Sequence, residues 1–195
     1  MIVVLSFTLQ NSKVNAYDCV QGMTYQVETI TIEGCEYDVG LCYSCGLTNP
    51  GEVWVVEITK LDPNCDPGIS FPLVVKHIYL QVSTSSFIYS NLCQDPPPCP
   101  TGNEMVVKKW ACWQIQMINY LGEETYKYKP CNYDAYCKER YAHCWNEDEQ
   151  RVERIFLEST YVGVPDCNLE AWEVSLPGKV GEETKCYRQF SSCED

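Results

Sequence analysis

The chain has 195 residues and carries a formal net charge of −13 at pH 7, with an isoelectric point near 4.5. Nucleic acids and anionic lipid surfaces are bound through clusters of Lys and Arg, and the sequence contains no such cluster. The composition therefore argues against both partners, while the length suits one large domain or two small ones.

A short apolar run occupies residues 2–7, and Val14, Asn15 and Ala16 follow at positions typical of signal-peptide cleavage. We expect residues 1–16 to be a signal peptide, with a first β-strand as the alternative. The basic residues that normally precede the apolar run are missing, and a start upstream of Met1 would supply them. No later apolar run is long enough to span a bilayer, so the prediction is a secreted protein, either extracellular or held at the cell surface or in the periplasm.

Residues 17–94 are predicted to form a first β-module. Three segments in it, residues 25–32, 52–59 and 71–82, are rich in β-branched or aromatic residues, and the first alternates polar and apolar positions. Turn sequences such as Asn49-Pro50-Gly51 separate them. All three segments are therefore predicted to be strands.

Asp62, Asn64 and Asp66 alternate in a loop of this module, with a spacing similar to that of oxygen ligands in calcium loops. Pro67 and Leu73 stand where such a loop has its glycine and its bidentate glutamate. Turn formation by Asp, Asn, Pro and Gly explains the segment without a metal, so calcium is a weak candidate partner here.

Consecutive prolines mark residues 95–103 as a semi-rigid spacer, and we place a domain boundary there. In the second module, residues 104–195, segments 106–120 and 154–162 are predicted strands. Residues 133–153 have charged residues at helical spacings. The predicted class is all-β and mainly antiparallel, with two small disulfide-stapled, β-sandwich-like modules and at most one short helix near residues 133–153.

Cysteine makes up about 7 per cent of the chain, close to the density of secreted disulfide scaffolds. The even count predicts seven bridges with no thiol left over, in an oxidising compartment, but not which cysteines pair. We assign a structural role to all of them: Cys19, Cys35, Cys42, Cys45, Cys65, Cys93, Cys99, Cys112, Cys131, Cys137, Cys144, Cys167, Cys186 and Cys193.

An internal duplication is predicted from two similar segments, residues 34–45 and 130–144. Each contains Cys, a polar residue, Tyr and Asp in that order, with a second Cys six or seven positions after the first. Aligning the surrounding cysteines leaves Cys99 and Cys186 without counterparts, and these two are free to pair with each other. The remaining bonds are expected to stay mostly within residues 19–93 and within residues 112–193.

Two cysteine motifs are candidates for catalysis. A redox Cys-x-x-Cys site needs a helix N-terminus, whereas Cys42 and Cys45 lie in predicted strand and turn, so separate disulfide partners are expected. His143 adjoins Cys144, and a catalytic cysteine needs a base such as histidine within reach. The side chains of adjacent residues seldom face each other, however, so this pair is not expected to be catalytic. The sequence contains no other nucleophile, base or metal motif. We therefore predict that the chain is not an enzyme and that it has no catalytic residue, cofactor or metal centre.

The sequence contains 14 Tyr and 5 Trp, and Trp110 and Trp113 bracket Cys112. Tyr and Trp fill cores but are also enriched in surfaces that bind proteins or glycans. The leading hypothesis is a secreted, non-enzymatic structural or adhesive protein, a self-assembling subunit of an extracellular fibre or surface layer whose unpaired strand edges, including residues 17–32, are completed by a neighbour. The alternative is a soluble binding module, such as a proteinase inhibitor or a glycan or protein binder.

Overall fold

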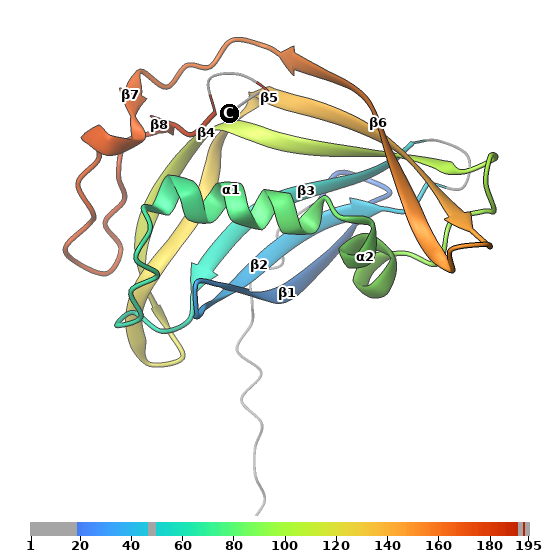
Figure 1. Ribbon diagram of the computed structural model, residues 1–195. Coiled ribbons are helices and arrows are strands. Elements are labelled where there is room, and N and C mark those ends of the chain that lie inside the picture. The colour runs from blue at the N-terminus through green and yellow to red at the C-terminus, as the bar shows by residue number, and fades with distance from the viewer. Residues whose placement is uncertain (1–18, 47–49, 191–192, 194–195) are drawn as a thin grey trace, which may run out of the picture.

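The computed structural model describes residues 19–46, 50–190 and 193, and Figure 1 shows their arrangement. The expected signal peptide, residues 1–16, lies outside the described residues. Strands dominate the described part, which confirms the all-β, mainly antiparallel class. The helices and strands in chain order are β1 (Thr24–Ile32), β2 (Cys35–Ser44), β3 (Gly51–Lys60), α1 (Phe71–Val82), α2 (Ser85–Phe87), the π-helical turn η1 (Ile88–Leu92), β4 (Asn103–Tyr120), β5 (Glu123–Asn146), β6 (Arg151–Val162), β7 (Leu169–Glu170), the 3₁₀ turn η2 (Ala171–Glu173) and β8 (Tyr187–Arg188).

Two antiparallel meanders supply most of the sheet. In the first, β1 pairs with β2 and β2 with β3. Glu33 and Gly34 form the two-residue β1–β2 turn, with φ of 49° and 80°. Positive φ at both positions is the geometry that matches the right-handed twist of the flanking strands. The β4–β5 turn of the second meander repeats this solution with Leu121 and Gly122.

Strand β5 joins the two meanders. It pairs with β4 along most of its length, and its other side pairs with β3 near Tyr128 and with β6 from Tyr136 to Asn146. Strand β3 also runs parallel to the start of β4. The two expected modules thus contribute to one eight-stranded sheet and are not separate sandwiches, and the expected duplication is not confirmed.

The proline-rich spacer, residues 95–103, is fixed to the end of β5. The N–H of Cys99 donates to the carbonyl oxygen of Trp145 at 3.0 Å, and the N–H of Trp145 donates to the carbonyl oxygen of Pro97 at 3.0 Å. The Cys99–Cys144 disulfide lies beside these bonds. The spacer is therefore attached to the second half of the sheet and is not a free linker.

Residues 71–82, predicted as a strand, form helix α1. Pro72 is in the first turn, a position where its missing N–H costs nothing, and the buried residues recur at helical spacing: Val74, Val75, Ile78, Tyr79 and Val82. The β-branched residues that suggested a strand lie on this buried face. Burial of that face against the sheet outweighs their weak strand preference.

Residues 133–153, predicted to include a helix, lie in β5, the following turn and β6. From Ala135 to His143 every second residue of β5 is buried, which is the period of a strand with one face in the core. The charged residues Lys138 and Arg140 lie between the buried positions. Their spacing is compatible with a helix, but the segment is a strand, because every second side chain between them is buried on one face. Cys137 and Cys144 consequently do not share a helical face, and they bond to different partners.

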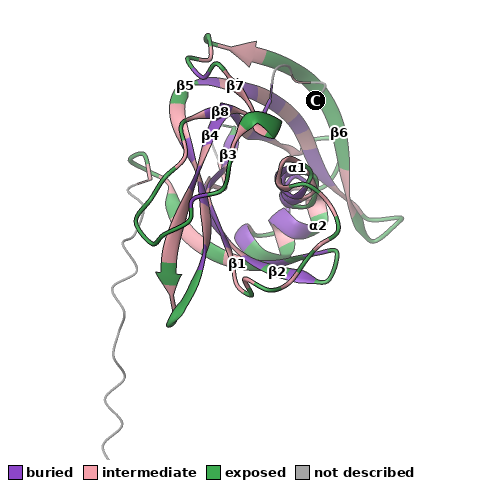
Figure 2. Ribbon diagram, turned by 90° about the vertical axis from the view of Figure 1, so that its left-hand side faces the viewer, coloured by how far each residue is buried: buried purple, intermediate pink, exposed green. Residues whose placement is uncertain are grey.

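The curved sheet wraps around α1, and Figure 2 shows the helix nearly end-on, with the sheet around it. The larger core cluster contains residues from both halves, among them Leu41 of β2 and Trp113 of β4. Tyr79 of α1 packs edge-on against Trp113 at 6.4 Å and against Phe190 at 5.5 Å between ring centroids. The helix therefore occupies a core that both halves of the chain build.

Two substitutions in α1 test this packing. Ile78 is fully buried and Leu80 is 62% exposed, although residues two apart share a face in a strand. Ile78→Ala is expected to lower the free energy of unfolding by about 2–5 kcal/mol, through lost burial and a residual cavity. Leu80→Ala is expected to cost less than about 1 kcal/mol. Denaturant unfolding followed by tryptophan fluorescence measures both, and equal losses would contradict the helix.

Candidate functional site

Seven disulfides join all fourteen cysteines, and no free cysteine remains. Three bridges lie in the N-terminal part, three in the C-terminal part, and one ties the spacer to β5. In that order the pairs are Cys19–Cys42, Cys35–Cys65, Cys45–Cys93, Cys112–Cys167, Cys131–Cys186, Cys137–Cys193 and Cys99–Cys144.

The pairing stays within residues 19–93 and 112–193 apart from Cys99–Cys144. Cys99 and Cys186 do not bond to each other, because Cys99 lies against the end of β5 whereas Cys186 lies beside Cys131. The pairing also does not repeat between the aligned segments. The counterpart of Cys19–Cys42 would be Cys112–Cys137, but Cys112 bonds to Cys167.

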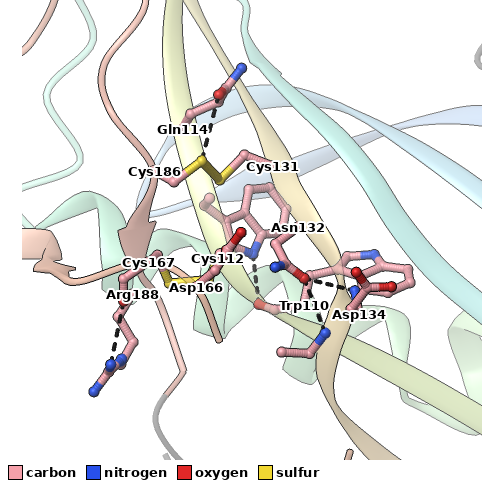
Figure 3. The surroundings of a disulfide bond; sticks show 12 residues. Trp110, Cys112, Gln114, Cys131, Asn132, Asp134, Asp166, Cys167, Cys186 and Arg188 are labelled. Carbon is pink, nitrogen blue, oxygen red and sulfur yellow. Dashed lines mark hydrogen bonds between the residues drawn. A yellow bond between two sulfur atoms is a disulfide. The ribbon is translucent and has the colours of Figure 1, made fainter. Parts of the chain in front are cut away.

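The C-terminal segment, which has little regular structure, is held against β4 and β5 by two neighbouring disulfides (Figure 3). Cys112–Cys167 attaches it to β4, and Cys131–Cys186 attaches it to β5. A hydrogen bond from Arg188 Nη2 to the carbonyl oxygen of Cys167, at 3.3 Å, joins two parts of this segment, and β8 pairs with β4 at Cys112 and Trp113. These cysteines fix the path of the chain, which is a structural role.

One disulfide has a carboxylate beside it. The sulfur atoms of Cys99 and Cys144 and a carboxylate oxygen of Glu153 lie within 4.8 Å of one another. The two sulfurs are bonded to each other, however, and metal binding by cysteine requires thiolates. The group is therefore a disulfide with a neighbouring acid.

In the candidate calcium loop, the Asp side chains accept backbone hydrogen bonds. Asp62 Oδ1 accepts from the N–H of Asn64 at 2.8 Å, and Asp66 Oδ1 accepts from the N–H of Gly68 at 2.9 Å. Both are the local turns that Asp commonly forms with the backbone two residues on. The loop has a structural explanation, and calcium binding there stays a prediction.

A row of buried polar side chains follows the core face of β5. Glu139 forms an ion pair with Lys109 and accepts a hydrogen bond from Tyr141 Oη at 2.6 Å. The guanidinium of Arg154, from β6, lies 4.1 Å from the Tyr141 ring centroid. His143 completes the row, and it is fully buried beside Tyr89 and Tyr141. These groups are charged or titratable, but His143 is closed to solvent and thus to a substrate.

Burial holds His143 neutral. Desolvation, helped by the nearby Arg154 charge, lowers the pKa of His143 from 6.5 to about 4. Neither ring nitrogen has a hydrogen-bond partner among the described residues. An imidazolium at this position would be a buried cation next to another cation, so protonation opposes folding.

Acid should therefore destabilise the protein through His143. As the pH falls below 6.5, His143 becomes protonated in the unfolded chain, whereas in the folded chain it stays neutral until about pH 4. The free energy of unfolding therefore falls across this window, by at most about 1.4 kcal/mol per pH unit. His143→Phe should remove this loss while the carboxylates still titrate in both proteins. Urea unfolding at pH 7.5 and pH 4.5 measures the effect. If the free energies of unfolding of the variant and the wild type differ by the same amount at both pH values, this role of His143 is contradicted.

The edge strand β6 carries the most exposed group of apolar residues on a strand. Ile155, Phe156 and Leu157 are 54%, 56% and 43% exposed, although they are consecutive in the sequence. Among the described strands, β6 pairs only with β5. In Figure 1 it crosses the right-hand side of the molecule, and in Figure 2 it is an outer, largely exposed ribbon.

Neither face of β6 is covered here, since every residue from 154 to 160 is exposed, and the segment also contains a register shift. Phe156 lies opposite Tyr141 and Glu158 lies opposite Arg140, so Leu157 has no counterpart on β5. Such a bulge breaks the regular alternation of a strand. The sequence signal for this surface was available, since three apolar residues in a row between Arg154 and Glu158 do not fit a strand with one buried face.

Among the described strands, β1 (Thr24–Ile32) is the other long edge strand, within the segment where the sequence predicts an unpaired edge, and the two-residue β7 is a further, short one. Strand β1 is less open than β6. The side chain of Gln26 donates to the carbonyl oxygen of Asn91 at 3.3 Å, and Ile30 and Ile32 are buried. Neither long edge strand contains a cysteine, so the bridges leave both of them unstapled.

The two tryptophans around Cys112 have different environments. Trp113 is fully buried and packs against α1, so it is a core residue. Trp110 is 2% exposed and its ring contacts those of Trp54, Tyr133 and Tyr136 in edge-to-face pairs. We call these four rings the aromatic cluster. Its members come from β3, β4 and β5, and sequence reasoning identified Trp110 alone.

In comparisons with known proteins, no family model, no curated protein and no solved structure matches the chain. In the described part of the chain, no helix is long and apolar enough to cross a membrane.

Proposed function

We propose that this chain is a secreted, non-enzymatic structural or adhesive protein that associates with a second copy of itself through β6. The observation that carries the proposal is the free edge of β6, with Ile155, Phe156 and Leu157 exposed along it. An exposed apolar edge is a template for pairing with another strand, and proteins that stay monomeric usually block it.

The disulfides support a role outside the cell. Seven bridges with no free thiol suit an oxidising compartment. Each bridge closes a segment of 23 to 56 residues and so reduces the freedom of the unfolded chain. A typical contribution is about 2–4 kcal/mol per bridge, with heavy non-additivity. Resistance to unfolding and proteolysis serves a durable extracellular component.

The apolar residues of β6 can pair with those of a second copy. Antiparallel pairing with Phe156 opposite Phe156 places Ile155 opposite Leu157, and apolar pairs across strands are stabilising. Arg154 and Glu158 do not form a pair in this arrangement, because the bulge directs them to opposite faces of the strand. The Glu158 side chain is half exposed even though it pairs with Arg140 within the chain.

The charge balance of β6 also favours contact. The strand contains two Arg and two Glu, whereas the whole chain has a net charge of −13. Two copies would repel each other over most of their surfaces but not at this strand. Such a two-fold contact closes into a dimer, so a fibre or layer requires a second contact, for which β1 is the other long edge strand among the described residues.

Phe156→Glu tests the proposal. It is expected to abolish a concentration-dependent dimer, because it places two like charges opposite each other and removes the central apolar contact. Leu121→Glu is the matched control, since Leu121 is 84% exposed at the β4–β5 turn, away from β6, and receives the same charge. Sedimentation velocity in oxidising buffer measures all three proteins.

Wild type and Leu121→Glu should dimerise equally, and Phe156→Glu should remain monomeric with an unchanged near-ultraviolet circular dichroism spectrum. A wild-type protein that stays monomeric at high concentration would contradict self-association. A dimer that survives Phe156→Glu would contradict β6 as its interface.

A further inference from the structure

A hollow of about 380 Å³ opens beside the aromatic cluster. Four rings line it, together with Lys108, Val20 and the Cys19–Cys42 disulfide; the rings are those of Trp54, Trp110, Tyr133 and Tyr136. The volume lies within the range of small-molecule sites, which are lined mainly by apolar and aromatic side chains with a few polar groups. The hollow does not involve β6, so it is distinct from the proposed association surface.

The rings are held in place by their surroundings. Trp54 and Trp110 meet edge-to-face at 5.5 Å, and Trp110 meets Tyr133 at 4.9 Å and Tyr136 at 5.4 Å between centroids. The indole N–H of Trp54 donates to Glu52 Oε2 at 2.8 Å. Neighbouring strands and a disulfide fix the wall, so these side chains lose little conformational entropy when a ligand binds.

The charges at the hollow are already paired. Lys108 Nζ lies 3.0 Å from Glu52 Oε2 and 4.1 Å from the centroid of the Trp54 ring. A cationic ligand would have to compete with Lys108 for the aromatic face. An anionic ligand would meet Glu52 and the field of a chain with a net charge of −13. The charges therefore favour a neutral ligand.

The polar groups at the hollow favour a neutral ligand that can form hydrogen bonds. Lys108 lines the hollow, and its amino group has N–H donors beyond the one that faces Glu52. Tyr133 and Tyr136, which also line the hollow, carry phenolic hydroxyl groups. A ligand with hydroxyl groups of its own therefore suits this lining better than a purely apolar one.

We infer that the aromatic hollow binds a neutral sugar ring of a polysaccharide. A pyranose has apolar faces formed by its C–H groups, which pack on aromatic rings, and hydroxyl groups around its rim that both donate and accept hydrogen bonds. It thus matches the aromatic rings, the amino group of Lys108 and the tyrosine hydroxyls of the lining. Tyr133, 41% exposed, is the most exposed ring of the wall.

Co-sedimentation with insoluble cellulose, chitin, xylan, mannan and starch tests the inference on the oxidised, full-length protein. At least one of these neutral polysaccharides should retain the protein. Titration with its oligosaccharide should then change tryptophan fluorescence, since Trp54 and Trp110 line the hollow. Polygalacturonate and tetramethylammonium chloride serve as anionic and cationic probes.

Tyr133→Ala and Trp54→Leu should each lower the affinity about tenfold or more, as expected for aromatic residues at the centre of a binding site. Trp172→Ala is the matched control, because Trp172 is 82% exposed and outside the hollow. Its affinity should equal that of the wild type. Because Tyr133 is partly exposed, its variant is expected to fold even where Trp54→Leu does not.

Three results would overturn the inference: no retention by any of the five polysaccharides, preferential binding of either charged probe, or binding that Tyr133→Ala and Trp172→Ala weaken equally. The β6 variant Phe156→Glu should bind sugar as the wild type does. Failure of sugar binding therefore leaves self-association untouched, and the reverse also holds.

Discussion

The rest of the structure depends on the packing of α1 against a sheet that neither half of the chain supplies alone. Val75 and Ile78 face a core built from β2, β3, β4, β5 and the C-terminal segment. Strand β5 makes this possible, since its 24 residues are long enough to pair with both meanders. Burial of one helical face by a curved sheet satisfies the main hydrophobic requirement of the fold.

The disulfides act mainly around this core. Four of them attach the segments with little regular structure, namely the spacer and the C-terminal part, to β4 and β5. Strands β1 and β6 contain no cysteine and are the long edge strands among the described residues. The same design thus gives a rigid interior and leaves two strand edges for contacts with other molecules, as the proposed structural or adhesive role requires.

The sequence predicts the all-β class because alternation in residues 25–32 and in β4 is a local property. It does not predict α1, because Val74, Val75 and Ile78 favour strands locally. The helix is stabilised only when these residues are buried against the surrounding sheet. The partner of each cysteine depends on long-range strand pairing, which spacing does not encode. The aromatic cluster likewise combines β3, β4 and β5, so sequence inspection finds Trp110 but not its neighbours.

Differential scanning calorimetry of the oxidised protein tests most directly whether both halves form one core. One transition is expected, with a calorimetric enthalpy equal to the van't Hoff enthalpy, because α1 cannot lose either half of the sheet without exposing its buried face. Two separate transitions, one for residues 19–94 and one for residues 104–190, would contradict the shared core and favour two independent modules.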